Sequence, residues 1–165
     1  MSLGIQGVHH IGVSVPDLAK AREFYIDLLG AVEEVPPLAW DKGNAFIDAI
    51  VGLKDSSANQ FMARLGNTHF EVFEYHSPRS PDQDPDKGVH NFGYTHFALQ
   101  VDDIRAVYDR MLAAGIRFHA PPEYSLISMG EDGTKRGFTS TYGRDFFGNV
   151  FEIIEIHAND EILPI

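Results

Sequence analysis

Two strand-like runs of alternating apolar and polar residues lie in different halves of the chain. In residues 10–15 the branched side chains of Ile11, Val13 and Val15 would share one face, while a histidine, a glycine and a serine share the other. Residues 96–101 repeat this order, again with a histidine first and apolar side chains opposite. The small or polar residues beside each histidine leave room for a ligand, although the solvent-facing side of a sheet would show the same pattern.

A helical pattern follows each of these strands. Apolar residues recur at helical spacing over residues 18–29 and again over residues 104–112, and a glycine shortly after each stretch is suited to end a helix. Asp17 can cap the first helix, and Asp102 or Asp103 can cap the second. The order of strand, cap, helix and glycine is therefore the same in both halves of the chain.

The two halves also end alike. Residues 68–76 (THFEVFEYH) and 149–157 (NVFEIIEIH) are rich in β-branched and aromatic residues, which is typical of strands. Both segments place a Phe-Glu pair at the same point, so that Glu71 corresponds to Glu152. Each half then reads as a strand, a helix and about three further strands, which is a βαβββ module written twice.

A stretch rich in proline separates the two repeats. Residues 76–92 hold several prolines among aspartates and a glycine, and this composition disfavours a regular element. We therefore predict a first βαβββ module over residues 5–75, a linker over 76–92 and a second module over 93–157. Neither half closes a core alone, so we expect the two to form one structural domain together.

Composition and charge exclude several classes of function. The chain carries 13 Lys and Arg against 24 Asp and Glu, a formal net charge of −11, which argues against nucleic acid and anionic membrane surfaces as partners. No apolar run approaches the roughly 18 residues of a membrane span. The absence of cysteine removes disulfides, thiolate metal sites and cysteine nucleophiles together. A cytoplasmic protein acting on a small molecule is the default expectation.

The repeated histidines and glutamates are candidate metal ligands. If the modules pair about a pseudo-twofold axis, His10 meets His96, and Glu71 meets Glu152. Two imidazoles and two carboxylates suit one divalent ion such as Zn, Ni, Co, Mn or Fe. A single histidine or glutamate on a strand is more often a surface residue, so the matched places in two repeats carry this prediction.

Three further residues are candidates for substrate contacts. His69 lies two residues before Glu71 and would share its face of the strand, although a cross-strand partner on the sheet would look the same. Gln100 would share the face of His96, and Tyr142 lies in the expected strand region before residues 149–157. We predict that His69, Gln100 and Tyr142 bind substrate.

Other polar residues of the repeats are predicted to lie away from the metal. By strand alternation, His9 would point to the face opposite His10 and have a structural role. Glu74 and Glu155 would also face away, either as surface charges or as ends of hydrogen-bond networks.

The chain resembles the vicinal oxygen chelate superfamily, which includes glyoxalase I, methylmalonyl-CoA epimerase, extradiol dioxygenases and bleomycin- or fosfomycin-resistance proteins. The resemblance is carried by HHIGVSVPDLAKAREFYIDLLG, FEVFEY, THFALQVDDIRAVYDRMLAAG and DFFGNVFEIIEI, which span about residues 5–157. The usual DPDGN turn before the last strand is here Asp145–Asn149, with two bulky apolar residues in its middle.

The resemblance implies an α+β fold in which two paired βαβββ modules form a half-open, cup-shaped mixed β-sheet with helices on the outside. It also implies one divalent metal ion held by the first and last strands of each module. Matched residue by residue, the ligands are His10, Glu71, His96 and Glu152. A glutamate at 71 is similar to the glyoxalase I arrangement, whereas epimerase-like members commonly have glutamine there. The resemblance is also compatible with a homodimer.

The leading hypothesis is a metal-dependent lyase or isomerase of the glyoxalase type that acts on a small carbonyl or thioester substrate. The metal would polarise the carbonyl, and Glu71 or Glu152 would move a proton between carbons. One alternative is an Fe(II) extradiol-type dioxygenase that uses His10, His96 and Glu152 as ligands and leaves Glu71 spare. The other is a non-catalytic small-molecule-binding or resistance protein.

Overall fold

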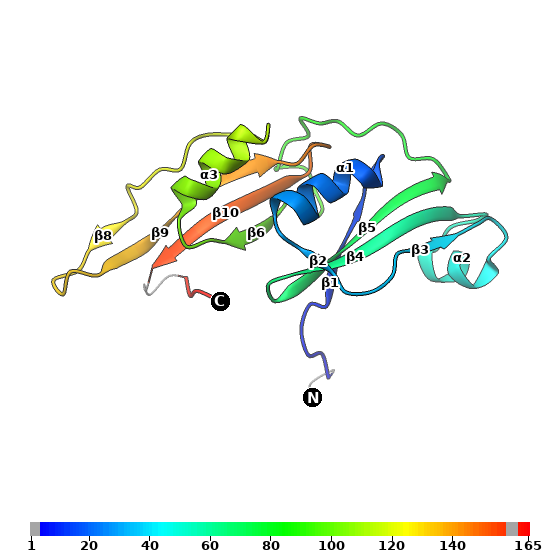
Figure 1. Cartoon of the computed structure of the whole chain (residues 1–165), viewed down its shortest axis with the longest axis horizontal. Helices are drawn as coiled ribbons and strands as arrows, with labels where there is room; N and C mark the ends of the chain where they lie inside the picture. Colours follow the sequence, from blue (N-terminus) through cyan, green and yellow to red (C-terminus); the bar gives the residue numbers. More distant parts are fainter. Residues whose placement is uncertain (1–3, 158–161) are drawn as a thin grey trace. The chain divides into compact units, whose positions relative to one another are not determined.

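The structure, a computed structural model, describes residues 4–157 and 162–165 and divides into two compact units between Asp82 and Gln83. Each unit holds one five-stranded sheet (Figure 1). The division falls inside the stretch 76–92, and no helix or strand occurs between Ser77 and Phe97. That the two modules make one structural domain stays a prediction.

The first unit builds a mixed sheet with strand order β1-β5-β4-β2, in which β3 also pairs with β4. Strand β1 runs parallel to β5, while β5 and β4 form an antiparallel hairpin. Its elements are β1 (His10–Ser14), α1 (Leu18–Arg22), the π-helical segment η1 (Glu23–Leu28), β2 (Val32–Glu33), β3 (Leu38–Trp40), α2 (Ala45–Val51), β4 (Ser57–Leu65) and β5 (Thr68–Ser77).

The second unit repeats this topology with strand order β6-β10-β9-β7, in which β8 also pairs with β9. Strand β6 runs parallel to β10, and β10 pairs with β9 in antiparallel fashion. Its elements are β6 (Phe97–Gln100), α3 (Ile104–Ala113), β7 (Arg117–Phe118), β8 (Ser128–Met129), β9 (Lys135–Arg144) and β10 (Val150–His157). The predicted α+β class with mixed, open sheets is confirmed.

The helices start and stop where the sequence indicates. The Asp17 carboxylate accepts from the Lys20 amide, and the Asp103 carboxylate accepts from the Ala106 amide, both at 2.9 Å. These side chains satisfy amides that have no partner inside the helix, so Asp17 and Asp103 are the N-caps, and Asp102 is not. Gly30 has a φ of 79°, a left-handed conformation that a glycine adopts without strain.

The first core lies between the α1–η1 helix and the sheet, as Figure 1 shows for α1 over β5 and β4. Phe24 and Tyr25 of the helix are fully buried, as are Phe61 and Phe70 of the sheet, and the rings of Tyr25 and Phe70 lie 4.9 Å apart. Each such side chain contributes about 1.5–3 kcal/mol by leaving water. The predicted apolar face of this helix is therefore the face that packs.

The second core repeats this packing with one difference from the prediction. Ile104, Tyr108 and Met111 of α3 are buried against the sheet, but Leu112 is 43% exposed. Leu112 follows Met111 directly, and one residue turns a helix by about 100°, so its side chain leaves the packed face. The inclusion of Leu112 in the core stripe was wrong.

Candidate metal and substrate site

Strand pairing in the first unit brings His10 and Glu71 together. In the parallel β1–β5 register, Glu71 lies opposite Gly12, two residues beyond His10, and strand residues two apart share a face. The His10 Nε2 atom lies 3.2 Å from the Glu71 Oε2 atom. Gly12 has no side chain, and no heavy atom beyond its chain neighbours lies within 4 Å of the place where a Cβ would stand, so this face is open beside the pair.

Strand pairing in the second unit builds the same pair again. Glu152 lies opposite Ala98, which is two residues beyond His96, so the offset between histidine and glutamate equals that in the first unit. The His96 Nε2 atom lies 3.3 Å from the Glu152 Oε2 atom. The same nitrogen faces the same kind of oxygen, at nearly the same distance, in both units.

The chemistry of each pair fits two neighbouring ligands of one divalent cation. Ligand atoms about 2.1 Å from a cation and roughly 90–110° apart lie about 3.0–3.4 Å from each other, which matches both distances. A single His–Glu pair at this distance would equally suit an ion pair between a protonated imidazole and the carboxylate. Across residues 4–157 and 162–165, no three His, Asp or Glu side chains gather into a metal-binding group. Each unit holds two of the four predicted ligands.

Tyr142 is a predicted substrate residue that lies beside the pair of the second unit. It stands opposite Glu152 in the β9–β10 register, and its ring centroid is 4.5 Å from that of His96. Burial, followed by the negative charge of Glu152, raises the pKa of the Tyr142 phenol above its ordinary value. The phenol therefore remains a hydrogen-bond donor at neutral pH beside the His96–Glu152 pair.

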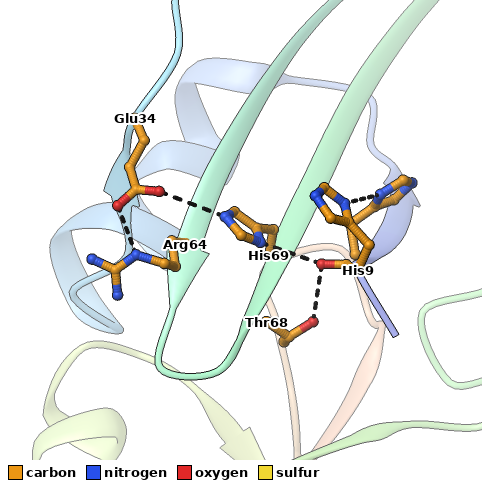
Figure 2. Close-up of polar contacts among 6 residues, drawn as sticks. His9, Glu34, Arg64, Thr68 and His69 are labelled. Carbon is orange, nitrogen blue, oxygen red and sulfur yellow. Dashed lines mark hydrogen bonds and ion pairs between the residues drawn. The ribbon is translucent and has the colours of Figure 1, made fainter. Parts of the chain in front are cut away.

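Gln100 and His69 have protein partners in the structure. The Gln100 Oε1 atom accepts a hydrogen bond from the Ile165 amide at 2.9 Å. The two ring nitrogens of His69 face the His9 carbonyl at 3.3 Å and the Glu34 Oε2 atom at 3.6 Å, as Figure 2 shows. His69 thus joins a polar network on the sheet of the first unit, and its assignment to substrate stays a prediction.

Glu34 and Arg64 complete this network, and no motif of the sequence pointed to them. The Arg64 Nε atom donates to the Glu34 Oε1 atom at 2.6 Å (Figure 2). This hydrogen bond is the main reason that the pKa of Glu34 lies below its ordinary value. Their contact depends on Glu33–Ala63 pairing between β2 and β4, a long-range register that local patterning does not reveal.

His9 does not lie where strand alternation placed it. Its Nδ1 atom is 2.9 Å from the His10 Nδ1 atom, and its ring stacks on His69 with centroids 5.1 Å apart and an interplanar angle of 10°. Strand β1 begins only at His10, so the alternation of faces does not extend back to His9. The side chain instead contacts two histidines of the candidate site.

Glu74 and Glu155 bind the helix starts rather than lying free on the surface. The Glu74 Oε2 atom accepts from the Leu18 amide at 3.0 Å, and the Glu155 Oε2 atom accepts from the Ile104 amide at 2.9 Å. Of the two expected roles, the hydrogen-bond role is the correct one. The signal was present in the sequence, because each repeat places this glutamate three residues after its candidate ligand.

The chain belongs to the Glyoxalase/Bleomycin resistance protein/Dioxygenase superfamily, whose family pattern matches residues 7–153. This finding confirms the resemblance drawn from the sequence motifs. None of the described helices is long and apolar enough to span a bilayer.

Two kinds of relative match in sequence, and both are named as epimerases. A 2-epi-5-epi-valiolone epimerase from an Actinomyces species is 30% identical over 158 residues, which cover 94% of this chain and 82% of that protein. The mitochondrial methylmalonyl-CoA epimerase of Mus musculus is 31% identical over 105 residues, 60% of this chain. This chain spans 48% of the length of the mouse protein.

Solved structures share the fold at low sequence identity. A glyoxalase family protein from Bacillus cereus matches with a TM-score of 0.76 and 16% identity over 96% of this chain and 99% of its own. A fosfomycin resistance protein from Listeria monocytogenes, solved with Mn(II) and sulfate, matches with a TM-score of 0.56 and 17% identity over 93% of this chain and 94% of its own.

Proposed function

We propose that this protein is a metal-dependent epimerase that moves a proton at the carbon next to the carbonyl of a small substrate. The observation that carries the proposal is the His–Glu pair built at the same register in both units. Two features of the comparisons support it: the superfamily match over most of the chain and a near full-length relative that is named as an epimerase.

In this proposal the two pairs hold one divalent cation, with His10, Glu71, His96 and Glu152 as ligands. Imidazole nitrogen and carboxylate oxygen suit Zn, Ni, Co, Mn or Fe(II). The bound cation would act as a Lewis acid that polarises the substrate carbonyl and so acidifies the neighbouring C–H bond. The network of His9, His69 and Glu34 would keep one pair in place.

The two glutamates are the proposed proton-transfer groups. An epimerase must take a proton from one face of a carbon and return a proton to the opposite face, which calls for two groups of suitable basicity. Glu71 and Glu152 occupy equivalent places in two repeats and would each serve one face. Tyr142, with its protonated phenol, would donate a hydrogen bond to a substrate oxygen, and Gln100 and His69 would contact the rest of the molecule.

Net charge favours a neutral substrate over a polyanionic one. With a formal charge of −11, the protein repels anions at long range, and a coenzyme A thioester would need a local basic patch to compensate. Arg144 of β9 cannot contribute to such a patch, because it is buried and donates to the carbonyls of Gly148 and Lys87. A small hydroxylated ketone therefore fits this protein better than a coenzyme A ester.

Hydrogen exchange with solvent tests the reaction. The protein would be stripped with a chelator, reloaded with each of the five metals and incubated in D2O with 2-epi-5-epi-valiolone or with methylmalonyl-CoA, the compounds that the relatives' names contain. We expect one deuterium next to the carbonyl, and the second epimer, only when metal is present. Absence of exchange with both compounds and every metal would contradict the proposal, and oxygen uptake on a catechol with Fe(II) would favour the dioxygenase instead.

Metal stoichiometry tests the shared site. Equilibrium dialysis should find one tightly bound cation per chain, and both His10→Ala and His96→Ala should lose it. Two tight cations per chain would show that each pair acts alone. An equimolar mixture of the two variants tests for a homodimer. Metal binding returns on mixing only if one chain supplies the first His–Glu pair of a site and a partner copy supplies the second.

A further inference from the structure

The residue before each candidate ligand contacts the far side of its imidazole. The His10 Nδ1 atom lies 2.9 Å from the His9 Nδ1 atom, and the His96 Nδ1 atom lies 2.9 Å from the Thr95 Oγ1 atom. In both units Nε2 is the nitrogen that faces the glutamate. The two histidines therefore share one ring orientation, with Nδ1 bound to the preceding side chain.

This contact favours one tautomer of the imidazole, and the tautomer sets which ring nitrogen is free to bind a cation. A neutral imidazole carries one N–H donor and one nitrogen with a free lone pair, and only the latter can coordinate. The Thr95 hydroxyl can accept from an Nδ1–H group of His96, which leaves the lone pair on Nε2. His9 does the same for His10 when its own proton is on Nε2, because its Nδ1 atom then accepts.

Neighbouring residues hold the ring and the backbone of His9 in place. Its ring stacks on His69, and its backbone carbonyl lies 3.3 Å from the His69 Nδ1 atom and 3.4 Å from the Thr68 Oγ1 atom. Figure 2 shows His9 beside His69, with Thr68 reaching the same carbonyl. Both the ring and the backbone of His9 are therefore fixed by neighbouring residues of β5.

Different residue types perform the same task in the two units. A histidine at position 9 and a threonine at position 95 have little in common except a side-chain acceptor at the right distance from the next ring. His9 lies one residue before β1 and Thr95 two residues before β6, outside the regular alternation of faces that keeps side chains of adjacent residues apart.

From this geometry we infer that His9 and Thr95 are positioning residues, which keep the following histidine in the Nδ1–H tautomer so that Nε2 presents its lone pair to the shared cation. The inference rests on the proposed metal site and adds a requirement to it. Partners on the far side of a ligating imidazole typically change metal affinity by about 10- to 100-fold.

Paired variants at each position test the inference. Thr95→Val removes the hydroxyl and keeps the shape, while Thr95→Ser restores an acceptor. His9→Phe keeps a ring for stacking on His69, while His9→Asn restores an acceptor. Affinity for Zn²⁺ and Co²⁺ would be measured by competition with a coloured chelator, and the tautomers of His10 and His96 would be read from long-range 1H–15N spectra of the metal-free protein.

We expect Thr95→Val and His9→Phe to weaken metal binding by about 10- to 100-fold and to raise the Nε2–H tautomer of the neighbouring histidine. The Ser and Asn variants should return both properties toward wild type. If all four variants keep the wild-type affinity and tautomers, the positioning role is wrong and the metal site stands. If His10→Ala and His96→Ala leave metal binding unchanged, the proposed site itself fails, and the positioning role fails with it.

Discussion

The two units share their strand topology and repeat three contacts around the helix starts and the His–Glu pairs. Each has an aspartate N-cap and a glutamate of the last strand bound to the helix start. Each also has a His–Glu pair in which the glutamate lies opposite the residue two positions after the histidine. The first two contacts hold the helix on its sheet, and the third is the candidate metal site. The repeated features are thus those that place the pairs on the sheets.

The two units differ in one helix and in the residues beside the pairs. The first unit adds helix α2 and, beside its pair, a polar network of His9, His69, Glu34 and Arg64. The second unit has no counterpart of α2 among its described residues, and the His96–Glu152 pair lies against the aromatic ring of Tyr142. A duplicated scaffold has therefore kept one kind of pair while its two sets of neighbours diverged.

The largest expected effect is on epimerisation, where Glu71 and Glu152 are each assigned to one face of the substrate carbon. Glu152→Gln and Glu71→Gln should each lower epimerisation by about 10²- to 10⁴-fold, because each removes one proton-transfer group. Each variant should still exchange deuterium into one epimer and fail with the other, and the two variants should show opposite preferences. NMR of both epimers in D2O measures this.

Metal content is the control for this comparison, since a glutamine oxygen can still act as a ligand. Should both variants retain metal and lose exchange with the same epimer, the assignment of one face to each glutamate is wrong.

The two glutamates that bind the helix starts should differ in their effect on stability. Glu155, whose side chain is 11% exposed, accepts from Ile104 and also contacts His157 at 2.8 Å, whereas the Glu74 side chain is 29% exposed. Charged hydrogen bonds weaken when water screens them, so we expect Glu155→Ala to lower the free energy of unfolding by about 3 kcal/mol and Glu74→Ala by about 1 kcal/mol. Urea denaturation measures both, and equal losses would contradict the role of burial.

The turn before β10 and the turn before β5 are stabilised differently, so mutations in them should also differ in their effect on stability. The Asp145 carboxylate accepts from the amides of Phe147 and Asn149 and from the Asn149 side chain, and burial raises the pKa of Asp145. In the first unit, Gly66 turns the chain with a φ of 57°. Asp145→Ala should lower the free energy of unfolding by about 2 kcal/mol because buried donors lose their acceptor, and Gly66→Ala by about 1 kcal/mol through backbone strain.

Thermal or urea unfolding of both turn variants tests these values. Asp145→Asn is a matched control that retains one acceptor oxygen, and it should lie between wild type and Asp145→Ala. A loss from Asp145→Asn as large as that from alanine would show that charge, rather than the number of acceptors, matters at this turn.

The smallest expected effect is a pH dependence of stability that comes from Asp48 in the first unit. Asp48 of α2 accepts from the hydroxyl and the amide of Ser56, and these bonds lower the pKa of Asp48 below its ordinary 3.8. A carboxyl group whose pKa is lower in the folded state contributes stability above the unfolded value and loses it as pH falls through the folded value. The difference in stability between wild type and Asp48→Asn should therefore shrink as the pH falls below 3.8. Urea titrations across this range test it, and a gap that widens in acid would contradict the assignment.

Local patterning predicted most of the scaffold. The first helix cap, the strands that start and end each half and most of the apolar face of each helix follow from the sequence pattern, which left the second cap open between Asp102 and Asp103. Helix α2 was missed because its seven residues, AFIDAIV, are too short for helical spacing to differ from other apolar patterns, and its start and end depend on Asn44 and Gly52. The contact of His9 with His10 was missed because alternation holds only inside a strand, and the strand starts one residue later.

The sequence by itself determined that a histidine and a glutamate recur in two βαβββ repeats, since each repeat is written in residues close together along the chain. Only the tertiary structure decided that the residues of each pair meet through a parallel strand register, that a glutamate reaches each helix start, and that His9 and Thr95 lie behind the imidazoles. These contacts join segments far apart in the sequence or break the regular alternation of a strand, and so they depend on sheet pairing rather than on local preference.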